Sequence, residues 1–276
     1  KLAQQTITVN RYRNMGKDQK VLFHETVFGP IHSRRLGVSL GINLLPNDGK
    51  VCSFDCLYCE AGYNRQGTGT TGMPQSLAVA RELEAKLKKM AEDNELPDYI
   101  TFSGNGEPTM HPQFEDIVKD TVRLRDKYAP KAKIAVLTNA TRLNSRWVVR
   151  ALGMVDENIL KLDSAVRPTQ VLINRPSSRR DHCNHIIENL KQFRNVGIIQ
   201  TMLVRGNYLS HIVDNTTENE IAHLIEAYRE ISPRRIQIYS IDRSTPCEHL
   251  KAVPREDLQQ IAERITRETG IEVQVV

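Results

Sequence analysis

The stretch VCSFDCLYCE, Val51–Glu60, places three of the chain's five cysteines in the spacing C-x3-C-x2-C. It lies between a predicted strand at Ser39–Leu45 and a predicted amphipathic helix at Ser76–Asp93. Charged and aromatic neighbours such as Asp55 make it too polar for a core element whose cysteines are simply buried. We therefore predict a loop that presents thiols at the carboxyl end of a strand.

Further strand–helix units follow this first one. Apolar runs predict strands at Tyr99–Ser103, Lys133–Thr138, Asn158–Leu162, Ile198–Val204, Arg235–Ile241 and Ile271–Val276. Amphipathic stretches predict helices at Gln113–Tyr128, Ser145–Leu152, Asp181–Arg194, Glu218–Ile231 and Pro254–Thr269. Strands that alternate with helices of this length indicate a parallel sheet, either a barrel or a doubly wound layer.

The cysteines follow the first predicted strand, and glycines or polar residues follow each of the next five, which is where a βα barrel builds its site. We therefore expect an α/β fold, a partial (β/α)6 TIM-type barrel formed by residues 39–276. Residues 1–38 do not fit the repeat and are predicted to be an N-terminal extension that caps the barrel.

The composition is that of an ordinary globular protein, with 39% hydrophobic and 26% charged residues. Its apolar runs are far shorter than the roughly 20 residues that cross a bilayer, and the N-terminus lacks the apolar core of a secretory signal. We therefore expect no membrane association and a cytoplasmic location. The net charge of +5 is mild, although arginine doublets such as Arg34–Arg35 could meet a phosphate or a carboxylate.

Three thiolates in one loop can hold a metal in two ways. A structural zinc ion needs a fourth ligand, which would have to be a distant residue such as Cys183, Cys247 or His182. A cubane iron–sulfur cluster is commonly held by four cysteines, so three leave one iron open to another ligand. Cys183 and Cys247 are too isolated to hold a second cluster and are predicted to be structural or incidental.

The cysteine spacing, with an aromatic residue before the last cysteine, resembles the hallmark of the radical S-adenosylmethionine (SAM) superfamily. Cys52, Cys56, Tyr58 and Cys59 match it in type and spacing. The resemblance implies a [4Fe–4S] cluster on the three cysteines, with the amino and carboxylate groups of SAM on the open iron. It implies that one electron cleaves SAM to methionine and a 5′-deoxyadenosyl radical. An external donor of the flavodoxin or ferredoxin type would supply that electron.

The loops after the next strands resemble the SAM-binding loops of the same superfamily. SGNGEP at Ser103–Pro108 is similar to its Gly-Gly-Glu-Pro loop, with Asn105 inserted between the glycines. The resemblance implies that this loop receives the cofactor's amino group. The cofactor-binding residues it implies are Tyr58, Gly104, Gly106, Glu107, Asn139, Asp163, Val204 and Ile241. Asn139 and Asp163 also suit helix capping, and Val204 also suits a core position.

The lead-in FGPIHSRRLGVSLGINLLP, Phe28–Pro46, resembles a wyosine-synthase-like branch of the superfamily, whose best-known members rebuild a guanine base in tRNA. The chain lacks the second cysteine set and the pyruvate-linked lysine of those members. The leading hypothesis is hydrogen abstraction from a small molecule, a nucleotide or tRNA. The alternatives are an activase that installs a glycyl radical on a partner protein, and a zinc-held binding module.

Overall fold

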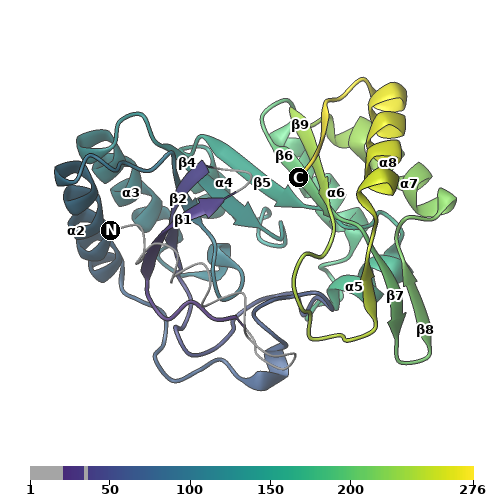
Figure 1. Ribbon diagram of the computed structural model, residues 1–276, viewed down its shortest axis with the longest axis horizontal. Helices are drawn as coiled ribbons and strands as arrows, with labels where there is room; N and C mark the ends of the chain where they lie inside the picture. The colour runs from purple at the N-terminus through teal and green to yellow at the C-terminus, as the bar shows by residue number, and fades with distance from the viewer. Residues whose placement is uncertain (1–20, 34–36) are drawn as a thin grey trace.

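The structure is a computed structural model that describes residues 21–33 and 37–276, and its main feature is an open, mostly parallel sheet (Figure 1). The strand order is β1-β2-β3-β4-β5-β6-β9-β11. These strands are β1 (Val27–Ser33), β2 (Gly37–Ile42), β3 (Tyr99–Phe102), β4 (Lys133–Thr138), β5 (Glu157–Lys161), β6 (Ile198–Met202), β9 (Arg235–Tyr239) and β11 (Val273–Val275). Only the β1–β2 pair in this sheet is antiparallel, and β1 and β11 are its unpaired edges. The predicted α/β class and partial barrel are confirmed, and the barrel is not closed.

Helices follow the strands and cover the sheet. They are α2 (Ser76–Glu92), α3 (Phe114–Tyr128), α4 (Arg146–Leu152), α5 (Arg167–Asn174), α6 (Cys183–Leu190), α7 (Glu218–Ile231) and α8 (Arg255–Thr269). Helices α2 and α3 lie beside one end of the sheet, and α7 and α8 lie beside the other (Figure 1). In α2 the buried residues Val79, Leu83 and Leu87 recur every four positions, which gives the helix one apolar face.

The two faces of the sheet differ in chemistry because successive side chains of a strand point to opposite sides. One face is apolar and joins the helices in the main core, through fully buried residues such as Leu40, Phe102 and Val136. The other face mixes polar and apolar groups, among them Thr101 and Gln200. This second face lines the inside of the partial barrel.

The predicted strand Ile198–Val204 is wrong at its end. β6 stops at Met202, and Val204 begins β7 (Val204–Tyr208). β7 pairs antiparallel with β8 (His211–Asp214) and β10 (Leu250–Ala252) in a separate small sheet. The apolar run is continuous in sequence, so its periodicity could not mark the point where the chain leaves the barrel.

The helix predicted at Asp181–Arg194 is shorter than expected. α6 begins at Cys183, and a 3-10 turn at Lys191–Phe193 follows it. Helix α5 was not predicted; Pro168 lies in its first turn, where a proline is tolerated.

The N-terminal region contributes to the main sheet through β1, which pairs with β2. The division into residues 1–38 and 39–276 stays a prediction. Arg34 and Arg35 lie outside the described residues. Across the described ranges, no helix is both long enough and apolar enough to cross a membrane.

Candidate active site

The cysteine loop, residues 43–75, connects β2 to α2 at the carboxyl edge of the sheet. Its backbone pairs with the loop after β3, because the Val51 N–H donates to the Asn105 carbonyl at 3.0 Å and the Glu107 N–H donates to the Val51 carbonyl at 3.0 Å. It also pairs with the end of α5, where the Asp55 N–H donates to the Asn174 carbonyl at 2.9 Å. The cysteines are therefore held by several neighbouring loops.

The two glycines of the SGNGEP loop are required by contacts inside the chain. A Cβ on Gly106 would lie 1.9 Å from the Val51 carbonyl oxygen, and a Cβ on Gly104 would lie 2.4 Å from Asn43 Oδ1. Both glycines have positive φ, +139° at Gly106 and +152° at Gly104. Their absent side chains let the cysteine loop approach, and their roles in cofactor binding stay predictions.

Replacing Gly106 by alanine is expected to destabilise the protein by about 2 kcal/mol or more, through backbone strain and collision with Val51. Gly67→Ala is the matched control, since Gly67 also has positive φ (+96°) but a Cβ there would meet nothing within 4 Å. Denaturant unfolding of both variants measures the difference. Equal losses of stability in the two variants would show that the contact with Val51 does not contribute to stability.

The inserted residue Asn105 has a structural explanation. Its side chain is fully buried, accepts from the Phe23 N–H at 2.8 Å, and donates to the carbonyls of Phe23 and Pro46 at 2.9 and 2.8 Å. Its own N–H donates to Asn43 Oδ1 at 3.0 Å. Asn105 thus ties the segment before β1 to the glycine loop.

The thiols of Cys52, Cys56 and Cys59 are free of disulfides. Asn139 Nδ2 lies 3.6 Å from Cys52 Sγ, and Asn174 Nδ2 lies 3.5 Å from Cys56 Sγ. Burial raises the pKa of the Cys56 thiol to about 11 and raises that of Cys52 still further. Two of the sulfurs therefore already have amide donors directed at them.

The charges near the Lys50 ammonium indicate whether the cysteine loop suits a negatively charged iron–sulfur cluster. Its side chain is 2% exposed, and its ammonium donates to the Gly62 carbonyl at 2.8 Å and lies 3.5 Å from Asp55 Oδ1. Asp55 is itself shared with Arg175 and with the Asn64 N–H at 2.7 Å. Because a buried cation requires nearby negative charge, thiolates bound to a metal cluster fit this environment.

The pKa of Lys50 agrees with this balance. Burial alone would lower it, but the charges of Cys59, Cys52, Cys56 and Asp55 together raise it above its ordinary value. Lys50 was not predicted as a site residue, since a single lysine in a loop usually lies in solvent.

Glu107 joins two loops beside the cysteines. Its Oε1 accepts from Thr138 Oγ1 at 2.6 Å and from the N–H and hydroxyl of Thr109, while its Oε2 accepts from the Asn139 N–H at 2.6 Å. Burial raises the pKa of Glu107, and the hydrogen bonds from Asn139, Thr109 and Thr138 oppose that rise. Oε2 is the oxygen with capacity left for a further donor such as an ammonium.

Asp163 is the centre of a buried polar network after β5. The Tyr58 hydroxyl donates to its Oδ2, as does Asn174 Nδ2 at 2.6 Å, and Oδ1 accepts from the Met202 N–H at 2.9 Å. Lys161 lies 3.4 Å from Asp163 and donates to the Tyr58 hydroxyl at 2.8 Å.

Neither Lys161 nor Asn174 was predicted as a site residue. Burial tends to lower the pKa of Lys161, yet Asp163, Tyr239 and Cys56 raise it above its ordinary value, so the side chain is a fixed cation. The signal in the sequence was a lysine in the otherwise apolar run ILKL, Ile159–Leu162.

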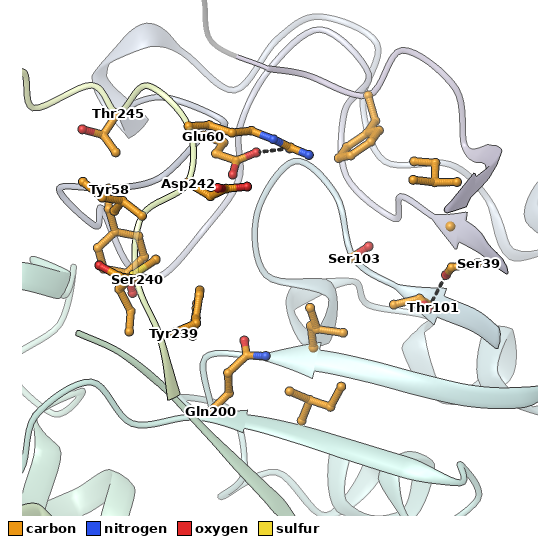
Figure 2. Close-up of a pocket in the computed structure, with 18 of the residues that line it drawn as sticks. Ser39, Tyr58, Glu60, Thr101, Ser103, Gln200, Tyr239, Ser240, Asp242 and Thr245 are labelled. Atoms are coloured by element: carbon orange, nitrogen blue, oxygen red, sulfur yellow. Dashed lines mark hydrogen bonds and ion pairs between the residues drawn. The ribbon is translucent and has the colours of Figure 1, made fainter. Parts of the chain in front are cut away.

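A pocket of about 340 Å³ lies on the inner face of the partial barrel and borders the cysteine loop at Tyr58 and Glu60. Figure 2 shows Ser39 and Thr101 on one side, Tyr239 on the other, and the Gln200 amide directed into the space between them. Ile241 lines this pocket, whereas Val204 is fully buried and does not. Arg243 also lines the pocket, and its guanidinium donates to Glu60 at 2.6 Å.

Of the remaining candidates for metal binding, Cys247 lies beside the cysteine loop, because its N–H donates to the Leu57 carbonyl at 3.3 Å, but the thiols of Cys183 and Cys247 bond elsewhere. Cys183 Sγ donates to the Ala165 carbonyl at 3.3 Å, and Cys247 Sγ donates to the Asn207 carbonyl at 3.5 Å. Within residues 21–33 and 37–276, no three His, Cys, Asp or Glu side chains converge as the ligands of one ion would. This gives the zinc hypothesis no support. It does not test a cluster, in which each cysteine binds a different iron.

Comparison with known proteins agrees with this fold. A family model for the radical SAM superfamily matches residues 47–228, and the chain belongs to that superfamily. Membership implies a [4Fe–4S] cluster, SAM and a source of electrons, and it leaves the substrate open.

The individual relatives have low sequence identity to this chain. GTPase Obg of Brachyspira hyodysenteriae is 29% identical over 266 residues, which are 95% of this chain but 36% of that protein. A radical SAM methyltransferase from Sphaerobacter thermophilus has the same fold, with a TM-score of 0.62, 14% identity and coverage of 86% of this chain and 65% of that one. A structure of TYW1 with a lysine-pyruvate adduct bound gives a TM-score of 0.59 at 14% identity, covering 83% of this chain and 73% of that one.

Proposed function

We propose that Cys52, Cys56 and Cys59 hold a [4Fe–4S] cluster and that the adjacent loops bind SAM for its reductive cleavage. The observation that carries the proposal is the cysteine loop itself. Its thiols are free of disulfides, their charges act on the buried Lys50, and the loop is bonded through Val51 to the loop of Glu107. When bound, the cluster supplies the single electron that breaks a carbon–sulfur bond of SAM.

The residues of this chain would bind and orient the cofactor through complementary charges. Glu107 Oε2 is suited to the SAM ammonium, and the partly buried cation of Lys161 is suited to its carboxylate. Asp163 and Asn174 orient Tyr58 and Lys161 through the network described above. Ile241 supplies an apolar surface in the pocket for the adenine ring.

The substrate is proposed to enter the pocket between Thr101 and Tyr239 and to be a small molecule, a nucleotide or a tRNA base. The amide of Gln200 and the hydroxyls of Ser39 and Thr101 can donate to and accept from an uncharged heterocycle. The wyosine-like lead-in at Phe28–Pro46 and the shared fold with TYW1 support a nucleic-acid base among these classes.

The proposed function is tested by anaerobic reconstitution with iron and sulfide. We expect a brown protein that, with dithionite and SAM, releases methionine and 5′-deoxyadenosine in amounts measurable by mass spectrometry. A colourless protein that retains zinc and leaves SAM intact would contradict the proposal.

Substrate candidates are then compared by deuterium transfer into 5′-deoxyadenosine from labelled nucleosides or tRNA. If tRNA is the substrate, its binding is expected to weaken steeply with salt, because phosphate contacts release counterions. Equal binding at low and high salt would favour a small molecule. Flavodoxin or ferredoxin in place of dithionite tests the proposed electron donor.

A further inference from the structure

Lys50 has an unusual position for a lysine, since it is the cation buried within the cysteine loop itself. Its ammonium interacts with one residue before Cys56 and with one residue after Cys59. Gly62, whose carbonyl accepts from Lys50 at 2.8 Å, donates its own N–H to the Cys59 carbonyl at 2.9 Å. Asp55, 3.5 Å from the ammonium, lies between Cys52 and Cys56 in the sequence.

The carboxylate of Asp55 cannot neutralise Lys50 completely. It also accepts from Arg175, whose guanidinium lies 4.5 Å from the centre of the Tyr63 ring. One carboxylate therefore serves two cations, so Asp55 alone does not cancel the charge of Lys50. Because the Lys50 side chain is 2% exposed, water screens this charge poorly.

We propose that the buried ammonium of Lys50 raises the reduction potential of the cluster held by Cys52, Cys56 and Cys59. Reduction adds one electron, taken from an outside donor, and so adds one negative charge to the cluster. A fixed positive charge nearby stabilises the reduced form more than the oxidised form. Lys50 keeps its proton throughout, and no bond to it forms or breaks.

This inference rests on the proposed function, because it requires a cluster on the cysteine loop. The expected effect is about tenfold in the equilibrium constant for one-electron reduction, or about 59 mV. An effect of this order is expected for a unit charge within about 10 Å at an effective dielectric constant of about 20.

The test is a redox titration of the reconstituted protein, followed by electron paramagnetic resonance, in wild type and Lys50→Met. Methionine keeps an unbranched side chain and removes the charge, so the potential is expected to become more negative. Lys86→Met is the matched control, since Lys86 also donates to one carbonyl (Gly29, 3.3 Å) and lies near one carboxylate (Glu25, 3.9 Å). Its potential is expected to equal that of wild type.

Each outcome bears on the inference. Equal potentials in Lys50→Met and wild type, at equal iron content, would overturn it. If Lys50→Met folds by circular dichroism but loads no iron, Lys50→Arg is titrated in its place: a loaded cluster with the wild-type potential supports the inference, and a failure to load or a more negative potential overturns it. Absence of a cluster from wild type would instead contradict the proposed function.

Discussion

Cys56→Ala is expected to fold but to lose its cluster, with 5′-deoxyadenosine formation falling on the order of 100-fold or more. Cys56 is 8% exposed and lies in the middle of the loop, where Asn174 Nδ2 is directed at its sulfur. Two cysteines cannot hold a cubane whose fourth iron must stay open. Iron and sulfide content per chain, measured beside SAM cleavage, checks this result.

Cys183→Ala is the control for removing a buried thiol. Cys183 is fully buried, but its sulfur donates to the Ala165 carbonyl, and this cysteine lies outside the cysteine loop. We expect wild-type iron content in this variant. Unchanged iron and unchanged SAM cleavage in Cys56→Ala would contradict the assignment of the cluster to the cysteine loop.

The second large effect is expected from Glu107→Gln, which removes the carboxylate from the site without shortening the side chain. A hydrogen bond to a charged group contributes about 1.5–3 kcal/mol, so SAM affinity should fall roughly 10- to 150-fold. The amide must also direct its NH2 at a donor, either Asn139 N–H or the threonines, so stability should fall by about 1–3 kcal/mol. Calorimetric titration with SAM and denaturant unfolding measure the two effects.

Thr138→Val, at a hydrogen-bonded neighbour of Glu107, separates the effect on SAM binding from the effect on stability. It removes one donor to Glu107 Oε1 and leaves the carboxylate charged. We expect a loss of about 1 kcal/mol in stability, with SAM affinity close to that of wild type. Equal SAM affinity in Glu107→Gln and wild type would remove Glu107 from the cofactor site.

Much of the fold was predictable because strand and helix periods are local properties. The helix at Glu218–Ile231 and the strand at Lys133–Thr138 have the predicted ends. The β7–β8 hairpin and the β10 pairing were missed, because a continuous apolar run does not show where a chain changes sheets. Gly206 allows β10 to lie close against β7, since a Cβ there would lie 2.1 Å from the His249 carbonyl oxygen.

The site was predictable only in part, because the sequence does not show which residues the tertiary structure brings together. The cysteine spacing and the residues after each strand are visible in sequence order, so Asp163 and Glu107 were named. Lys50, Lys161 and Asn174 were not, because each appears in sequence as an ordinary loop, strand or helix residue.

The sequence alone determined the class of chemistry, since three thiols at fixed spacing must lie in one loop wherever that loop is placed. It also determined the alternation of strands and helices that brings the following loops to one edge. Only the tertiary structure decided which charges are buried together, because burial depends on residues far apart in the chain. Lys50 is almost fully shielded from water within the cysteine loop, and Lys161 is partly shielded beside Asp163 and Tyr58.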